Sequence, residues 1–139
     1  SDVYKRQAEA EKLMDAGKFD DAVAAYDALL ASEPNDPVLI AGRNAAALLG
    51  RLDGKDPAAL LAAAQQHPDD VDAQLAAADV ELVGGRSADA FNRIIQVVRI
   101  THDEEREAAR TRLLDLFAMV GQSEPEVAAA RRSLAAALF

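Results

Sequence analysis

The sequence predicts an all-α protein built as an array of helical hairpins, with about eight helices in four antiparallel pairs. Half of the 139 residues are apolar, only 4% are aromatic, and alanine, the residue with the highest helix propensity, is abundant. Turn residues also return at a fixed interval, since Pro34 and Pro68 are 34 residues apart and Gly17 and Gly85 are 68 apart. This interval is typical of a helix-turn-helix repeat, which favours a binding scaffold over an enzyme.

The first repeat, residues 8–35, is expected to hold two helices separated by Gly17. Apolar residues recur at spacings of three and four on both sides of this glycine, which indicates amphipathic helices. The broader stripe comprises Ala22, Val23, Tyr26, Leu29 and Leu30. Glu33-Pro34 ends the second helix, because the residue before a proline is pushed out of the α region.

The second repeat, residues 36–69, begins with Asp36 as the predicted N-cap and Pro37 at the first helical position. Asp56-Pro57 repeats this pattern for the fourth helix, which is short and weakly patterned. His67-Pro68 then ends that helix in the same way as Glu33-Pro34.

The third and fourth repeats, residues 70–102 and 103–139, carry the strongest apolar stripes, led by Phe91, Ile94, Ile95 and Val98. Ser87 is the predicted N-cap of the sixth helix. Capping-box spacing marks the expected starts of the seventh and eighth helices, at Thr101 with Glu104 and at Ser123 with Glu126. The expected buried faces of these last helices comprise Leu113, Leu116, Phe117 and Val120, then Val127, Ala130, Leu134 and Leu138.

Three of the repeats share, in whole or in part, a pattern of a small residue, a large apolar residue four positions later and a proline twelve positions later. The sets are Ala22, Tyr26 and Pro34; Asp56, Leu60 and Pro68; Ala90, Ile94 and His102. This pattern resembles the tetratricopeptide repeat, from which Asp56 and His102 depart. The fourth repeat does not follow the register, as expected of a terminal repeat that caps an array.

The chemistry of known enzyme sites is not visible in the sequence. There is no cysteine, and no phosphate-binding loop, dinucleotide-binding motif, zinc-protease motif or serine-hydrolase elbow. His67 and His102 fall at predicted helix ends, and the acidic pairs fall near helix N-termini, where they complement the helix dipole. No catalytic residue, metal or cofactor is therefore expected. A net charge of −9 disfavours nucleic acid as a partner.

Two groups of residues are candidates for partner binding. Some tetratricopeptide arrays hold the terminal carboxylate of a partner with lysine, asparagine and arginine on their groove helices, and Arg43 and Asn44 lie on such a predicted helix. These two residues are not the full clamp, and a surface arginine beside an interior asparagine is the alternative. The second group, in the last helix, depends on a narrower resemblance.

From Asp69 onward, the segments DDVDAQLAAADVELVGG, RIIQVVR, RTRLLDLFAMVGQSEPEV and ARRSLAAALF resemble the C-terminal domain of the CnoX/YbbN thioredoxin-like family, also called chaperedoxins. The resemblance implies a holdase that binds non-native proteins and passes them to folding chaperones, including the chaperonin. It carries over to Arg131, Arg132, Leu134, Leu138 and Phe139 in the closing motif. Solvated arginines and ordinary leucine packing are the alternative, whereas a terminal aromatic such as Phe139 is suited to anchor a partner.

The family places a thioredoxin-fold domain before this one, and no such domain is present in this sequence. Ser1–Gln7, SDVYKRQ, matches the translation of a transposon-based sequencing adapter, so we expect a cut gene model with the thioredoxin domain missing upstream of Ala8. A native origin of these residues stays open. Residues 8–139 are then one tetratricopeptide-like domain.

The sequence thus predicts a protein–protein interaction module of a thioredoxin-like co-chaperone. The alternatives are a structural or dimerisation domain of a thioredoxin-like oxidoreductase and a generic tetratricopeptide adaptor. No apolar run approaches the length of a membrane span and no signal peptide opens the chain, which predicts a soluble, cytoplasmic protein. The oligomeric state stays open.

Overall fold

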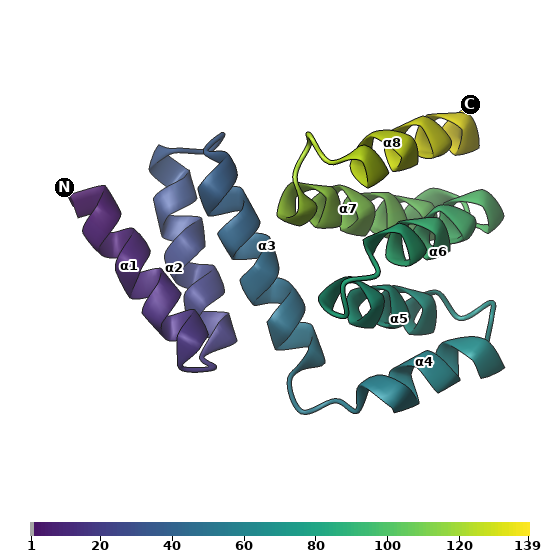
Figure 1. Cartoon of the computed structure of the whole chain (residues 1–139), viewed down its shortest axis with the longest axis horizontal. Coiled ribbons are helices and arrows are strands. Elements are labelled where there is room, and N and C mark those ends of the chain that lie inside the picture. The colour runs from purple at the N-terminus through teal and green to yellow at the C-terminus, as the bar shows by residue number, and fades with distance from the viewer. Residues whose placement is uncertain (1) are drawn as a thin grey trace. The chain divides into compact units, whose positions relative to one another are not determined.

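The computed structural model describes residues 2–139, and in that range it is all-helical with no strand. Eight helices follow one another along these residues (Figure 1). They are α1 (Asp2–Asp15), α2 (Phe19–Ser32), α3 (Pro37–Leu52), α4 (Pro57–Gln66), α5 (Val71–Val83), α6 (Ser87–Ile100), α7 (Asp103–Val120) and α8 (Pro125–Leu138). The predicted all-α array of about eight helices is confirmed. Of the segment suspected to be adapter-derived, Ser1 lies outside the described residues and 2–7 open α1.

The helices are divided between two compact units, which we call unit 1 and unit 2. Unit 1 ends at Asp53 and contains α1 to α3, and unit 2 begins at Gly54 and contains α4 to α8. The boundary falls inside the predicted second repeat, residues 36–69, between its two helices. The division of residues 8–139 into four repeats of one domain stays a prediction.

In unit 1, α2 lies between α1 and α3 and packs against both (Figure 1). The three helices bury one shared set of side chains, comprising Ala10, Ala22, Tyr26, Leu29, Leu39 and Ala46. The contact between α2 and α3 is close at one point, where the ring of Tyr26 covers the backbone of Gly42. Small residues at crossings allow this approach, and the large tyrosine ring fills the remaining space.

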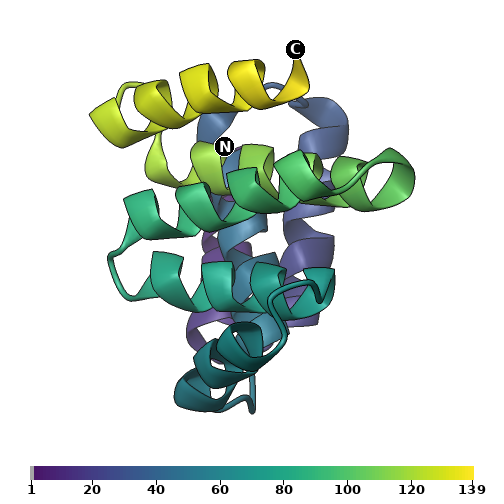
Figure 2. The same cartoon turned by 90° about the vertical axis from the view of Figure 1, so that its right-hand side faces the viewer.

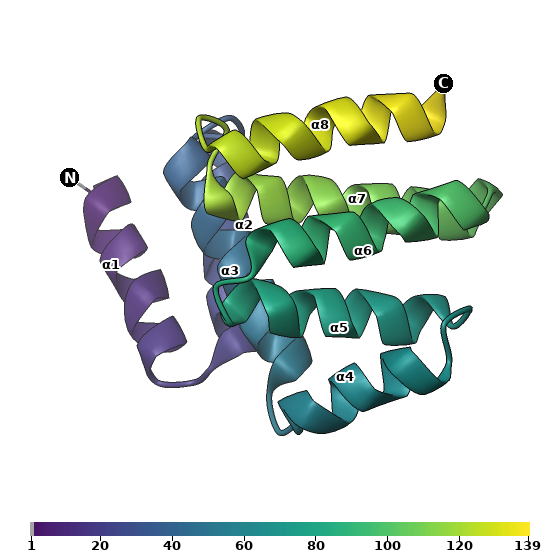
Figure 3. The same ribbon diagram turned by 45° about the vertical axis from the view of Figure 1, so that its right-hand side comes forward.

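In unit 2, α5 packs against α4 and α6, and α6 also packs against α7 and α8 (Figures 2 and 3). Helix α6 is central and buries its whole apolar stripe, as predicted. Phe91 of α6 meets Phe117 of α7 edge to face, with ring centroids 4.9 Å apart. In the last two helices, Leu113, Leu116, Phe117, Val127, Ala130 and Leu134 are buried as predicted, while Val120 and Leu138 are half-buried.

The 34-residue interval is visible in the backbone. Glu33 and His67 are the C-caps of α2 and α4, and their φ and ψ angles agree closely, at −128° and 67° against −128° and 70°. Three residues later, Asp36 and Asp70 cap α3 and α5, and each carboxylate accepts a hydrogen bond from a backbone N–H of the first turn. The spacing of the prolines therefore marks two copies of one connecting loop.

The glycine turns are also copies of each other. Gly17 and Gly85 adopt φ of +75° and +79°, a region that favours glycine. The next amide in each turn reaches back five residues, from Lys18 N to the carbonyl of Leu13 at 2.9 Å and from Arg86 N to that of Glu81 at 2.8 Å. This bond closes the end of α1 and of α5.

The predicted caps in the last two repeats are wrong. Ser87 is the first residue of α6, and its cap position is held by Arg86 without a side-chain hydrogen bond. Thr101 closes α6 instead of opening α7, because its hydroxyl donates to the carbonyl oxygen of Val97 at 2.6 Å. Glu124 caps α8 without a side-chain bond, so Ser123 is not the cap either.

Candidate functional site

Arg43 and Asn44 lie in the middle of α3 in unit 1, on different faces, because successive helical residues do not face each other. The Nε of Arg43 donates to Oδ1 of Asp27 on α2 at 3.1 Å, which makes it a partly exposed surface arginine. Asn44 is only 7% exposed and is part of the interior of the chain. The structure does not bring the two side chains into one clamp, and a ligand at either stays a prediction.

Arg131 and Arg132 are exposed on α8 in unit 2. The guanidinium of Arg131 lies over the ring of Phe117, 5.2 Å from its centroid, in cation–π geometry. The same group donates from Nε to Oε1 of Gln122 at 2.9 Å and from Nη2 to the same oxygen. Arg131 therefore links α8 to the last turn of α7 and to the loop that joins the two helices.

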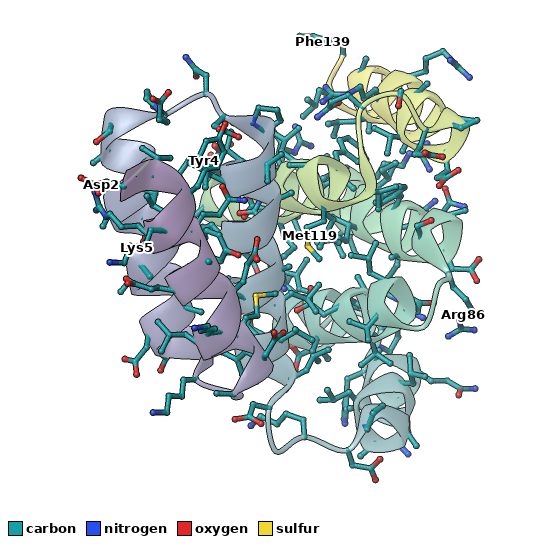
Figure 4. The ribbon with its side chains drawn as sticks, turned by 60° about the vertical axis from the view of Figure 1, so that its left-hand side comes forward. Asp2, Tyr4, Lys5, Arg86, Met119 and Phe139 are labelled. Carbon is teal, nitrogen blue, oxygen red and sulfur yellow. The ribbon has the colours of Figure 1, made fainter. Side chains whose placement is uncertain are left out.

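The end of α8 offers the most exposed aromatic side chain of the described residues. Leu134 is buried and Leu138 is half-buried, so both pack within unit 2. Phe139 is fully exposed and lies beyond the last turn of the helix (Figure 4). Phe139 can reach a partner without any rearrangement of the unit, although its docking role stays a prediction.

A buried polar network in unit 2 was not predicted from the sequence. Arg93 of α6 donates from Nε to Glu81 Oε1 at 2.6 Å, from Nη2 to Oε2 of the same carboxylate at 3.3 Å, and from Nη1 to Gln74 Oε1 at 2.7 Å. Glu81 and Gln74 are 5% and 7% exposed. The paired contact of a guanidinium with a carboxylate satisfies both groups where water is largely excluded.

The same network holds α4 in place. The Nε2 of Gln74 donates to the carbonyl oxygens of Ala64 at 2.8 Å and His67 at 3.3 Å, at the C-terminal end of α4. These carbonyls have no partner within the helix, so the amide of Gln74 acts as a cap supplied by α5. Because Ala64 is the only buried residue of α4, this polar contact is a large part of its attachment.

A second buried ion pair joins α5 to α7. Nη1 of Arg112 lies 2.8 Å from Oδ2 of Asp79, which is 1% exposed. One sequence signal could have indicated both networks. Asp79 and Glu81 interrupt the otherwise apolar run 75–83 of α5, and a carboxylate buried there without a partner would cost free energy.

Two hollows of the structure are lined by carboxylates. In unit 2 a hollow of about 440 Å³ lies at the starts of α5 and α7 and is lined by Asp69, Asp70, Asp72, Glu104 and Glu105. In unit 1 a hollow of about 330 Å³ beside the first turn of α2 includes Asp20, Asp21 and Asp53 with Lys18. Both surfaces repel anions. Within residues 2–139 no group of three or more metal-ligand side chains is arranged to hold an ion.

A third hollow, of about 400 Å³, has a different lining. It lies in unit 2 between the loop after α4 and the outer face of α6. Amide and apolar side chains dominate it: Pro68, Gln74, Asn92, Gln96, Val97 and Ile100, together with Arg93. Apart from Pro68, which the sequence marked as a helix stop, no residue of this hollow was singled out from the sequence, although Asn92, Gln96 and Ile100 recur at a spacing of four.

None of the helices in the described part of the chain is long and apolar enough to cross a membrane.

Comparison with known proteins gives relatives but no function. Uncharacterized protein Rv1324 and uncharacterized protein MT1366 of Mycobacterium tuberculosis and uncharacterized protein Mb1359 of Mycobacterium bovis are each 38% identical to the chain over 139 residues. The alignments cover 100% of this chain and 45% of each relative, so the chain spans less than half of their length. No solved structure matches the chain.

A model of the tetratricopeptide repeat family matches residues 50–139. This range includes most of unit 2, where α5, α6 and α7 pack in succession. The repeated loops and turns described above extend the same pattern into unit 1. The chain belongs to the tetratricopeptide repeat family.

Proposed function

We propose that the chain is the protein-binding module of a thioredoxin-like co-chaperone, which holds non-native proteins and passes them to folding chaperones. The observation that carries the binding function is the tetratricopeptide family match over residues 50–139, because such arrays act by presenting packed helices to other proteins. The module itself binds and does not catalyse. The cytoplasm is the compartment in which we expect it to act.

The co-chaperone role is supported by the closing segment of the chain, whose resemblance to the CnoX/YbbN family was given above. Phe139 is presented to solvent at the end of this segment, as a docking aromatic requires. The curated relatives are more than twice as long as the matched region, and a thioredoxin fold in the remainder is part of the proposal.

The holdase function is tested with insulin, whose B chain aggregates when dithiothreitol reduces its disulfides. The chain has no cysteine, so the reductant leaves it unchanged. We expect equimolar chain to suppress the rise in light scattering. Equal scattering with and without the chain would contradict the proposal, and the chain would then be a generic adaptor.

Docking to the chaperonin is tested by a pull-down with the Phe139→Ser variant, because deletion of the buried Leu134 would also disturb the fold of unit 2. We expect the variant to lose chaperonin. The matched control is Tyr4→Ser, which removes another exposed aromatic side chain, in unit 1, and should change nothing. Unchanged binding by Phe139→Ser would remove this docking site.

A structural or dimerisation domain is the competing function. Light scattering during size-exclusion chromatography discriminates between the two, since a monomer at all concentrations removes the dimerisation hypothesis. A dimer that neither suppresses insulin aggregation nor retains chaperonin would favour it.

A further inference from the structure

The outer face of α6 carries a short stripe that the packing of unit 2 does not use. Asn92, Gln96 and Ile100 follow one another at a spacing of four, which places them on one side of the helix. All three are exposed, and Ile100 retains 60% of its accessible surface. The hollow of about 400 Å³ lies along this stripe, where the exposed Pro68 adds apolar surface and Val97, which is 2% exposed, closes the base.

The polar groups in this hollow are held in place before any ligand arrives. Arg93 is bound to the carboxylate of Glu81 through Nε and Nη2 and to the Oε1 of Gln74 through Nη1. Its charge is thus compensated by a carboxylate that is itself buried. The hollow therefore combines a rigid floor with a charge balance close to zero, in contrast to the two carboxylate-lined hollows.

This charge balance and this lining select the chemistry of the ligand. A side-chain amide offers both donors and an acceptor, which matches the N–H and C=O groups of an extended peptide backbone. A helix has already paired those groups internally and would leave the amides without partners. A lysine-rich segment would prefer the acidic hollows, and an acidic segment is repelled by the net charge of −9.

We propose that the α6 hollow binds an extended, uncharged peptide segment, with the backbone paired to Asn92 and Gln96 and one apolar side chain placed against Pro68 and Ile100. This site rests on the proposed function, because non-native proteins are the source of such exposed segments. It assigns client contact to α6, at a distance along the chain from Phe139, which is assigned to chaperonin docking.

The test uses the whole chain and a fluorescein-labelled, acetylated and amidated heptapeptide of serine, threonine and glycine around one central leucine. Fluorescence anisotropy should show saturable binding. Ile100→Ser should weaken it about tenfold or more, the loss expected when an apolar side chain loses its buried contact. Gln96→Ala should weaken it about fivefold, as for one lost hydrogen bond. Peptides with the central leucine replaced by serine, glutamate or lysine should bind more weakly.

The matched control is Val83→Ser, which removes an exposed apolar side chain of unit 2, 54% exposed, outside this hollow. The proposal is overturned if wild type does not bind the leucine peptide, if Ile100→Ser binds it unchanged, or if Val83→Ser weakens it equally. Concentration-dependent dimerisation that Ile100→Ser abolishes would identify a second copy of the chain as the occupant and would also overturn it.

The insulin assay separates this proposal from the general function. Suppression of aggregation by both wild type and Ile100→Ser would overturn the α6 site and leave the holdase function standing. Peptide binding without any suppression by wild type would overturn the holdase function while supporting the site as a peptide receptor. Loss of both peptide binding and suppression in Ile100→Ser, with Val83→Ser unchanged, would support both.

Discussion

The closest approach between helices in unit 1 makes a quantitative prediction. A methyl group added at Gly42 would place its Cβ 2.6 Å from Cζ and 2.7 Å from Cε1 of Tyr26. The ring is 4% exposed and lies in the core of α1 to α3, so it has little room to move aside. Overpacking of this kind costs about 1–3 kcal/mol.

The same substitution has an opposing benefit, because alanine is favoured over glycine within a helix by about 1 kcal/mol. With the clash near the upper end of its range, Gly42→Ala should lower the free energy of unfolding by about 2 kcal/mol. Gly50→Ala is the matched control in the same helix. There the new Cβ would lie 3.2 Å from Cβ of Phe19, a milder contact that offsets the helix-propensity gain and leaves this variant close to wild type in stability.

Urea denaturation followed by far-UV circular dichroism measures both variants. The clash predicts that Gly42→Ala is less stable than Gly50→Ala by about 2 kcal/mol, and that Tyr26→Leu, which removes the ring, abolishes this difference. Equal stability of the two alanine variants, or a Gly42→Ala penalty that persists without the ring, would refute the reasoning.

Three further predictions concern single interactions. Arg112→Met should destabilise the chain by about 3 kcal/mol in denaturation experiments, because it breaks the ion pair of Arg112 with Asp79, which is 1% exposed; a cost below 1 kcal/mol would contradict this. Gln74→Ala should raise amide hydrogen exchange in α4 about tenfold or more but not in α7, since the carbonyl of Ala64 at the end of α4 loses the side-chain amide that caps it; equal effects on both helices would contradict it. Burial, reinforced by nearby acidic side chains, raises the pKa of Tyr26 above its ordinary 10.0. The folded state therefore holds this proton more tightly, and the associated stability is present below about pH 10 and lost as the pH rises further. In Tyr4→Phe, absorbance at 295 nm should show Tyr26 ionising at higher pH than N-acetyltyrosinamide; coincident titrations would contradict it.

Local sequence signals predicted most of the architecture. Asp36-Pro37 and Asp56-Pro57 begin helices for two reasons. The aspartate carboxylate accepts hydrogen bonds from backbone N–H groups of the first turn, and the proline has no N–H that would need an acceptor there. Both effects act within four residues. The glycine turns and proline stops are local in the same sense. For this reason the period of 34 residues corresponds to a real copy of the connecting loop.

The wrong caps show where local signals compete. Thr101 has the spacing of a capping box, but its hydroxyl also lies within reach of the last carbonyls of the preceding helix, and it donates to Val97. His102 stands where the two earlier loops, after α2 and after α4, have proline, and the loop between α6 and α7 differs from both. The C-cap of α6 is Thr101, and His102 directly after it is the N-cap of α7.

The candidate sites depended on contacts that no local pattern contains. Asp79 and Arg112 are 33 residues apart, and Gln74 and Arg93 are 19 apart, so their pairing depends on how the helices are stacked. The period predicted that the helices stack but not which polar side chains meet. The hollow beside α6 was missed because two of its walls come from a loop and from a neighbouring helix.

The division into two units has a consequence for spectroscopy. The chain has no tryptophan, and both of its tyrosines, Tyr4 and Tyr26, belong to unit 1. Intrinsic fluorescence is therefore a selective reporter of unit 1, whereas the circular dichroism signal of the helices reports on both units. If the units unfold as one cooperative block, the melting curves from the two signals will coincide, whereas two different midpoints would show that the boundary at Gly54 separates two independently unfolding units.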